Sequence, residues 1–196
     1  MKKIEIIWRE LLYSALEKDE RRFEQKDLAA KFGFSTSTVF QALKIPRQMG
    51  AVRVTGRYFI LEDPEKLLYH WASVHNLEND ILASFKVGEP VLDIEAKMPP
   101  EVIFGAYSAA RMSLTTPPAD YDKVYIYTDD IEKIKDRFEV KKGIPNLFIL
   151  KQDEFLSDYG QKTVTAQTFV DLWNLKDWYA KEYVKAIKEK IDAVLS

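Results

Sequence analysis

The fold of the first part of the chain is decided by the stretch Gly33-Phe34-Ser35-Thr36-Ser37-Thr38-Val39-Phe40-Gln41-Ala42-Leu43. Gly33 permits a tight turn, because glycine adopts backbone conformations that other residues avoid. Ser35 is a favourable N-cap residue, and Phe34 and Val39 have the spacing of a hydrophobic staple. The stretch therefore predicts a turn followed by a helix that begins at Ser35.

The segments on either side of this stretch extend the pattern. Pro46 pushes Ile45 out of the helical region, so we expect the helix to end near Lys44. Apolar side chains recur at helical spacing upstream, and two β-rich runs joined by Thr55-Gly56 predict a hairpin downstream. The expected bounds are helices at about 4–15 and 26–32 and strands at 51–54 and 57–61. The order helix, helix, turn, helix, hairpin is that of a winged helix-turn-helix.

The same stretch resembles the turn and recognition helix of bacterial and archaeal winged-helix regulators. Those helices commonly read Gly-apolar-Ser, two variable residues, Thr-Val, two variable residues, Ala-Leu, as Gly33 to Leu43 do here. The segment Lys26-Asp27-Leu28-Ala29-Ala30-Lys31-Phe32 resembles their first helix. The resemblance implies that the chain binds double-stranded DNA.

A helical wheel divides the predicted helix into an inner and an outer side. Val39, Ala42 and Leu43 cluster on one side, where they pack against the preceding helix. The opposite side is polar and holds Ser37, Gln41 and Lys44, with Phe40 beside them. Side chains of this kind suit a major-groove surface. The alternative is a solvated helix, or one used for protein contacts.

Each outward residue suggests a role on DNA. Gln41 can read adenine bidentately, Lys44 can reach a guanine or a phosphate, and Ser37 suits a phosphate at the helix start. The candidate DNA-binding residues are Ser35, Thr36, Ser37, Phe40, Gln41, Lys44, Arg47, Arg53 and Arg57.

Charge supports a local contact with a polyanion. Residues 1–62 carry 12 basic and 8 acidic side chains, a net charge of +4, whereas the remainder carries −6. Arg53 and Arg57 bracket the Thr55-Gly56 tip, where they can contact the DNA backbone or minor groove. The alternative is that they are edge-strand charges that discourage aggregation.

Composition excludes several classes of site. The chain has no cysteine, so disulfides, zinc ribbons and cysteine nucleophiles are ruled out. No apolar run approaches the roughly 20 residues that span a bilayer, and the N-terminus lacks a signal-peptide pattern. We therefore expect a cytoplasmic protein with no membrane partner.

The remainder of the chain predicts a second domain. Asp63-Pro64 marks a boundary, which gives a winged helix at 1–62, a helical connector at 63–98 and a mixed α/β domain at 99–196. Strands and helices alternate there, so the fold class is α+β. The expected helices are 65–74, 91–96, 108–112, 129–138, 167–173 and 176–194, and the expected strands are 102–104, 123–127, 146–150 and a short 163–165.

Two segments of this domain, 104–111 and 120–127, resemble the core of the nucleotidyltransferase-like fold. In active members a Gly-Ser pair opens a helix and cradles phosphate, and two aspartates on the following strand hold divalent metal. Alternation along a strand puts Asp120 and Asp122 on one face, as a metal site requires. These two aspartates are therefore the candidate metal and catalytic residues, with magnesium as the cofactor if the domain is active.

This sequence departs from the active pattern. Ala106 follows Gly105 where the phosphate-binding serine belongs, and Asp153 falls beyond the strand that would supply a third carboxylate. The combination of domains, with the segments 105–110 and 169–175, resembles the AbiEi-type antitoxins of type IV toxin–antitoxin systems. The resemblance implies a DNA-binding domain followed by a degenerate nucleotidyltransferase-like domain without catalysis.

The main hypothesis is a DNA-binding transcriptional regulator, antitoxin-like, that represses its own operon. The alternative is a metal-dependent nucleotidyltransferase recruited to nucleic acid by its winged helix. A third possibility is a protein-interaction module. The expected partners are double-stranded DNA, a cognate toxin and a second copy of the chain. The residues Phe169, Trp173, Trp178, Tyr179 and Tyr183 are expected in the core or at a dimer surface.

Overall fold

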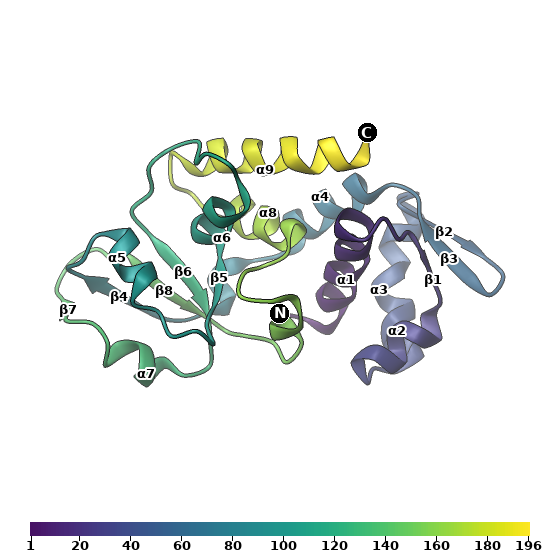
Figure 1. The fold of residues 1–196 in the computed structure, drawn as a ribbon. Helices are drawn as coiled ribbons and strands as arrows, with labels where there is room; N and C mark the ends of the chain where they lie inside the picture. Colours follow the sequence, from purple (N-terminus) through teal and green to yellow (C-terminus); the bar gives the residue numbers. More distant parts are fainter. The chain divides into compact units, whose positions relative to one another are not determined.

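The computed structural model describes residues 1–196 and divides them into two compact units. Unit 1 comprises residues 1–75 and 194–196, and unit 2 comprises residues 76–193. Helices and a β-sheet occur in each unit (Figure 1), which confirms the expected α+β class. None of the helices combines the length and apolar character needed to cross a membrane.

The elements of unit 1 follow the order expected from the sequence, with one addition. A short strand, β1, precedes the second helix and completes an antiparallel sheet of order β1-β3-β2 (Figure 1). The elements are α1 (Lys3–Glu17), β1 (Arg22–Phe23), α2 (Gln25–Phe32), α3 (Thr36–Gln48), β2 (Val52–Thr55), β3 (Tyr58–Leu61) and α4 (Pro64–Val74).

The start of α3 confirms the predicted turn and cap. Gly33 ends α2 with a φ of 61°, in the left-handed region that glycine adopts without strain. The Ser35 side chain accepts a hydrogen bond from the Thr38 backbone N–H at 3.1 Å. Phe34 and Val39 are both buried, as the hydrophobic staple requires.

The predicted end of α3 near Lys44 was wrong, because the helix continues through Pro46 to Gln48. A proline inside a helix leaves the carbonyl four residues earlier without its usual donor. That carbonyl belongs to Ala42, and the indole Nε1 of Trp8 in α1 donates to it at 2.7 Å. A contact from another helix therefore replaces the missing backbone bond.

Helix α1 is the centre of unit 1 and is buried on most sides. It packs against α3 and α4, and its apolar residues Ile7, Leu11 and Leu12 are fully buried. Its buried Glu5 carboxylate accepts a hydrogen bond from Trp71 Nε1 at 3.1 Å and lies 2.6 Å from His75 Nδ1. These polar contacts connect the first turn of α1 to the last turn of α4.

Unit 2 contains a five-stranded sheet of order β5-β6-β8-β4-β7 (Figure 1). Only β6 and β8 pair in parallel, and the other neighbours are antiparallel. The elements are the 3₁₀ turn η1 (Leu77–Asp80), β4 (Ile81–Val87), α5 (Val91–Ala96), β5 (Ile103–Gly105), α6 (Ala106–Ser113), β6 (Val124–Tyr127), α7 (Ile131–Lys135), β7 (Val140–Lys141), β8 (Leu147–Leu150), the 3₁₀ turn η2 (Leu156–Tyr159), α8 (Thr165–Trp173) and α9 (Ala180–Leu195).

Alternation along the central strands gives the sheet of unit 2 two different faces. Val124, Ile126, Leu147 and Ile149 lie in one apolar core with residues of α5 and α7. The intervening Tyr125 lies on the other face, where its ring contacts Tyr107 of α6 and stacks on Phe148.

The structure differs from the expected division at several points, one of which is strand β7, which was not predicted. The proposed connector, 63–98, does not form a separate part, because α4 packs on α1 whereas β4 and α5 belong to unit 2. Strand β4 was not predicted. The expected strand at 163–165 was wrong, since only Lys162 forms an isolated bridge and Thr165 already begins α8.

Candidate nucleic-acid interface

The outward side of α3 carries a continuous set of exposed side chains, which we call the α3 surface. It consists of Thr36, Ser37, Phe40, Gln41, Lys44 and Arg47, all of them exposed. The inward residues Val39, Ala42 and Leu43 are fully buried. Helix α3 therefore presents a polar and basic side to solvent while its apolar side holds it in the core.

No carboxylate neutralises the α3 surface from within its own part of the chain. Residues 28–61 contain no aspartate or glutamate. Lys44 forms no ion pair, and the Arg47 guanidinium lies 5.8 Å from the centroid of the Phe40 ring. The two cations are therefore available to a polyanion at little cost in broken contacts.

The first turn of α3 adds hydrogen-bond donors to this surface. The backbone N–H groups at a helix start have no intrahelical acceptors and favour an anion. The Ser35 hydroxyl already caps the Thr38 N–H and lies 3.0 Å from the Thr38 hydroxyl. Of the predicted phosphate contacts here, Thr36 and Ser37 are thus better placed than Ser35.

The two arginines of the β2–β3 hairpin differ in their surroundings. Gly56 has a φ of 58° in the turn, and the adjacent Arg57 is exposed and forms no ion pair. Arg53 lies further down β2 and forms an ion pair with Glu62. Because its charge is partly compensated, Arg53 is the weaker candidate for a phosphate contact.

Arg22 of β1 is a basic residue that the sequence analysis did not single out. It is exposed, and its guanidinium lies 3.7 Å from the centroid of the Tyr58 ring in β3. The stacking holds a cation against the β2–β3 hairpin. A two-residue strand has no periodicity that could have shown this placement in advance.

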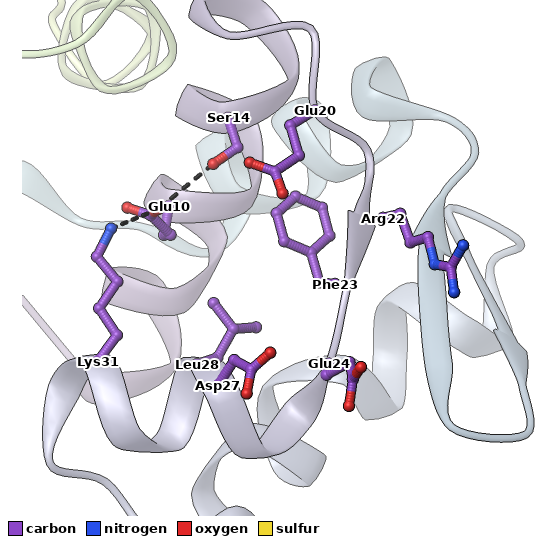
Figure 2. Close-up of a pocket in the computed structure, with 9 residues that line it drawn as sticks. All are labelled: Glu10, Ser14, Glu20, Arg22, Phe23, Glu24, Asp27, Leu28 and Lys31. Atoms are coloured by element: carbon purple, nitrogen blue, oxygen red, sulfur yellow. Dashed lines mark hydrogen bonds and ion pairs between the residues drawn. The ribbon is translucent and has the colours of Figure 1, made fainter.

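Two lysines of α2 lie in a different electrostatic setting. Elements α1, β1 and α2 line a hollow of about 360 Å³ (Figure 2). In it Lys31 Nζ lies 2.6 Å from Glu10 Oε1. Lys26 pairs with Glu24 at 3.2 Å. The hollow is further lined by Glu20 and Asp27. The basic patch expected over 26–57 is therefore concentrated on α3 and the hairpin.

The two candidate metal residues of unit 2 do not lie on a strand, as the nucleotidyltransferase-like pattern would have them. Asp120 and Asp122 lie in the loop before β6, which begins only at Val124, so strand alternation does not place them on one face. Both are exposed, and the Tyr179 hydroxyl donates a hydrogen bond to Asp122. No three histidine, aspartate or glutamate side chains gather as metal ligands anywhere in residues 1–196.

The start of α6, where phosphate would bind in the active pattern, is crowded. A Cβ added at Gly105 would lie 2.8 Å from the Tyr127 ring and 3.1 Å from Asp171 Oδ2. The Asp171 carboxylate is fully buried and accepts a hydrogen bond from the Tyr127 hydroxyl at 2.9 Å. The next residue, Ala106, has a φ of 45°, which is strained for a residue with a side chain. The chain's own carboxylate thus lies beside the helix start.

Of the five aromatic residues expected in the core or at a dimer surface, three are buried and two are exposed. Phe169, Tyr179 and Tyr183 are buried. Trp173 is 45% exposed and Trp178 is 74% exposed.

Comparison with known proteins gives no relationship on which to build. No family model matches the chain, and no curated protein or solved structure matches it.

Proposed function

We propose that unit 1 is a winged helix-turn-helix that binds double-stranded DNA, and that the chain is a transcriptional regulator. The observation that carries the proposal is the α3 surface, a polar and basic helix side with no carboxylate in residues 28–61. Helix α3 spans 13 residues, and an α-helix fits the major groove of B-DNA. In this arrangement α3 is the recognition helix and the β2–β3 hairpin is the wing.

The contacts divide between reading and positioning. Gln41 and Lys44, near the middle of the α3 surface, reach base edges, whereas Thr36 and Ser37 bind phosphate at the helix start. Arg57 at the wing tip contacts the backbone or the minor groove. Arg22, held against Tyr58, adds a further cation beside the wing.

Unit 2 then serves regulation rather than catalysis. Two observations argue against a bound triphosphate in unit 2. Asp120 and Asp122 lie in an exposed loop, and the Asp171 carboxylate lies beside Gly105. A regulator of this kind agrees with the resemblance to antitoxins that repress their own operon. In that role unit 2 binds a cognate toxin or a second copy of the chain, in the cytoplasm.

The wing offers a test with a matched control. Duplex binding by the parent chain should weaken steeply between roughly 50 and 200 mM salt. Arg57→Ala should weaken binding on all sequences. The slope of log binding constant against log salt concentration should fall by about one unit, as expected for one lost phosphate contact. Arg53→Ala should have the smaller effect, because Glu62 already compensates its charge. Fluorescence anisotropy on labelled duplexes over a salt series measures both.

Two results would contradict the proposal at different levels. A parent chain that binds no duplex even at the low-salt end rules out the DNA-binding function. Equal binding by the parent and by Arg57→Ala removes the hairpin from the interface but leaves the α3 surface to be tested.

A further inference from the structure

The α3 surface contains one large apolar side chain, Phe40, among polar and basic ones. Phe40 is 44% exposed, whereas Val39, Ala42 and Leu43 on the inner side of the same helix are fully buried. An exposed phenyl ring gains free energy when an apolar group of a ligand covers it, because apolar area is removed from water. Phe40 is therefore the position of the α3 surface best suited to an apolar contact.

Arg47 places a cation beside this ring. The two residues are seven positions apart, or about two turns of helix, so they lie along one line of α3. The Arg47 guanidinium lies 5.8 Å from the centroid of the Phe40 ring, which is within the range of a cation–π contact. Helix α3 therefore presents an apolar group and a positively charged hydrogen-bond donor next to each other.

The major groove offers an apolar group to such a ring. Base edges in this groove carry hydrogen-bond donors and acceptors, which a phenyl ring cannot pair with, and thymine adds a C5-methyl group. Phenylalanine is among the side chains that make apolar contact with that methyl group. Phe40 lies in the first half of α3, where recognition helices contact base edges. The ring therefore matches the methyl group in its chemistry and in its place on the helix.

We propose that Phe40 selects for thymine by covering its C5-methyl group in the major groove, while Arg47 binds a phosphate of the DNA backbone. This role rests on the proposed DNA binding and specifies which base the α3 surface selects. Arg47 lies in the last turn of α3, and the C-terminal end of a recognition helix can contact the backbone, as in homeodomains. The base 5-methylcytosine has the same methyl group but pairs with guanine. Thymine is favoured because Gln41, next to Phe40 in the chain, suits adenine.

Deoxyuridine provides the test, because it differs from thymidine only by the missing methyl group. The parent chain first selects duplexes from a randomised library, and each thymine of the selected duplex is then replaced in turn by deoxyuridine. At the contacted position this replacement should raise the dissociation constant about three- to tenfold, as expected for the loss of one methyl group from an apolar contact. Fluorescence anisotropy at constant salt measures the dissociation constants.

Substitutions on α3 assign the preference to one side chain. Phe40→Ala should bind the thymine and deoxyuridine duplexes equally, because the ring is gone, and Phe40→Leu should keep part of the preference. Ile45→Ala is the matched control and should keep all of it. Ile45 is also 44% exposed, but it lies five residues further along α3, about 140° around the helix from Phe40. Both positions are exposed, so the variants should fold as the parent does.

The outcomes separate this role of Phe40 from the proposed function. A parent chain that binds no duplex overturns both. A parent that binds duplex but tolerates deoxyuridine at every position overturns the role of Phe40 and leaves DNA binding intact, and so does a Phe40→Ala variant that keeps the preference of the parent. Tighter binding to a 5-methylcytosine·guanine pair than to the thymine·adenine pair at the contacted position overturns thymine as the recognised base.

Discussion

The hydrogen bond from Trp8 to Ala42 should hold the second half of α3 in place, and its contribution can be isolated. Trp8→Phe removes the indole N–H that donates to the Ala42 carbonyl at 2.7 Å. Pro46 has no N–H to replace it, so a buried carbonyl is left unsatisfied at a cost of about 1–3 kcal/mol. The smaller ring also leaves a cavity, which adds to the measured loss of stability.

A double-mutant cycle removes the cavity contribution. In a Pro46→Ala background the new backbone N–H can donate to the Ala42 carbonyl, so Trp8→Phe should cost about 1–2 kcal/mol less there than in the parent. Urea denaturation of the four proteins, followed by circular dichroism, gives the free energies of unfolding. If the two substitutions are additive within about 0.5 kcal/mol, the indole does not compensate for the proline and our explanation of the helix is wrong.

Three further predictions concern single sites. Gln41→Ala should cost about 1–3 kcal/mol at the preferred DNA sequence and leave non-specific binding nearly unchanged; an identical selected consensus for parent and variant would exclude Gln41 from base reading. Changing both Asp120 and Asp122 to asparagine should leave DNA binding intact, and neither protein should transfer labelled nucleotide with Mg²⁺ or Mn²⁺; turnover lost in the variant would make this an enzyme. Burial alone would raise the pKa of Glu5, but the hydrogen bond and charge of His75 lower that pKa below its ordinary 4.5. Ionised Glu5 therefore stabilises the fold fully above its ordinary pKa of 4.5. The stabilisation is lost as the pH falls through the lowered pKa of the folded state. Between neutral pH and pH 3, the melting temperature of Glu5→Gln should fall less steeply than that of the parent. Equal slopes of melting temperature against pH would refute a stabilising role for ionised Glu5.

Local signals in the sequence predicted the elements of unit 1 well. The cap at Ser35 and the turn at Gly33 depend on residues within three positions of each other, so the chain reveals them directly. The passage of α3 through Pro46 depends on Trp8, which is 34 residues away from Ala42. No local rule contains such a contact, and the rule for proline therefore ended the helix too early.

Unit 2 was harder to predict, for two different reasons. From Ala83 to Val87, strand β4 alternates apolar residues with Ser84 and Lys86, so the sequence does contain a strand signal there. The loop position of Asp120 and Asp122 was not readable, because β6 begins where Val124 enters the core. Short strands leave their flanking polar residues without a determined face.

The sequence could not predict which cations of the candidate site are paired with carboxylates. Arg53 and Arg57 look equivalent along the chain, yet only Arg53 meets a carboxylate, that of Glu62. Lys31 is likewise paired with Glu10, from another helix. Which cations are available to a polyanion is decided by such contacts, and it becomes visible only in the folded unit.

The way α3 is anchored bears on how this chain can diverge. The helix is held by Val39, Ala42 and Leu43 on its inner side, together with the Trp8 indole, and none of these residues belongs to the α3 surface. Exposed substitutions usually change stability by less than about 0.5 kcal/mol. Positions such as Gln41 and Lys44 can therefore be exchanged with little effect on folding. Descendants of this sequence, or libraries built on it, can therefore vary the α3 surface without first acquiring compensating mutations.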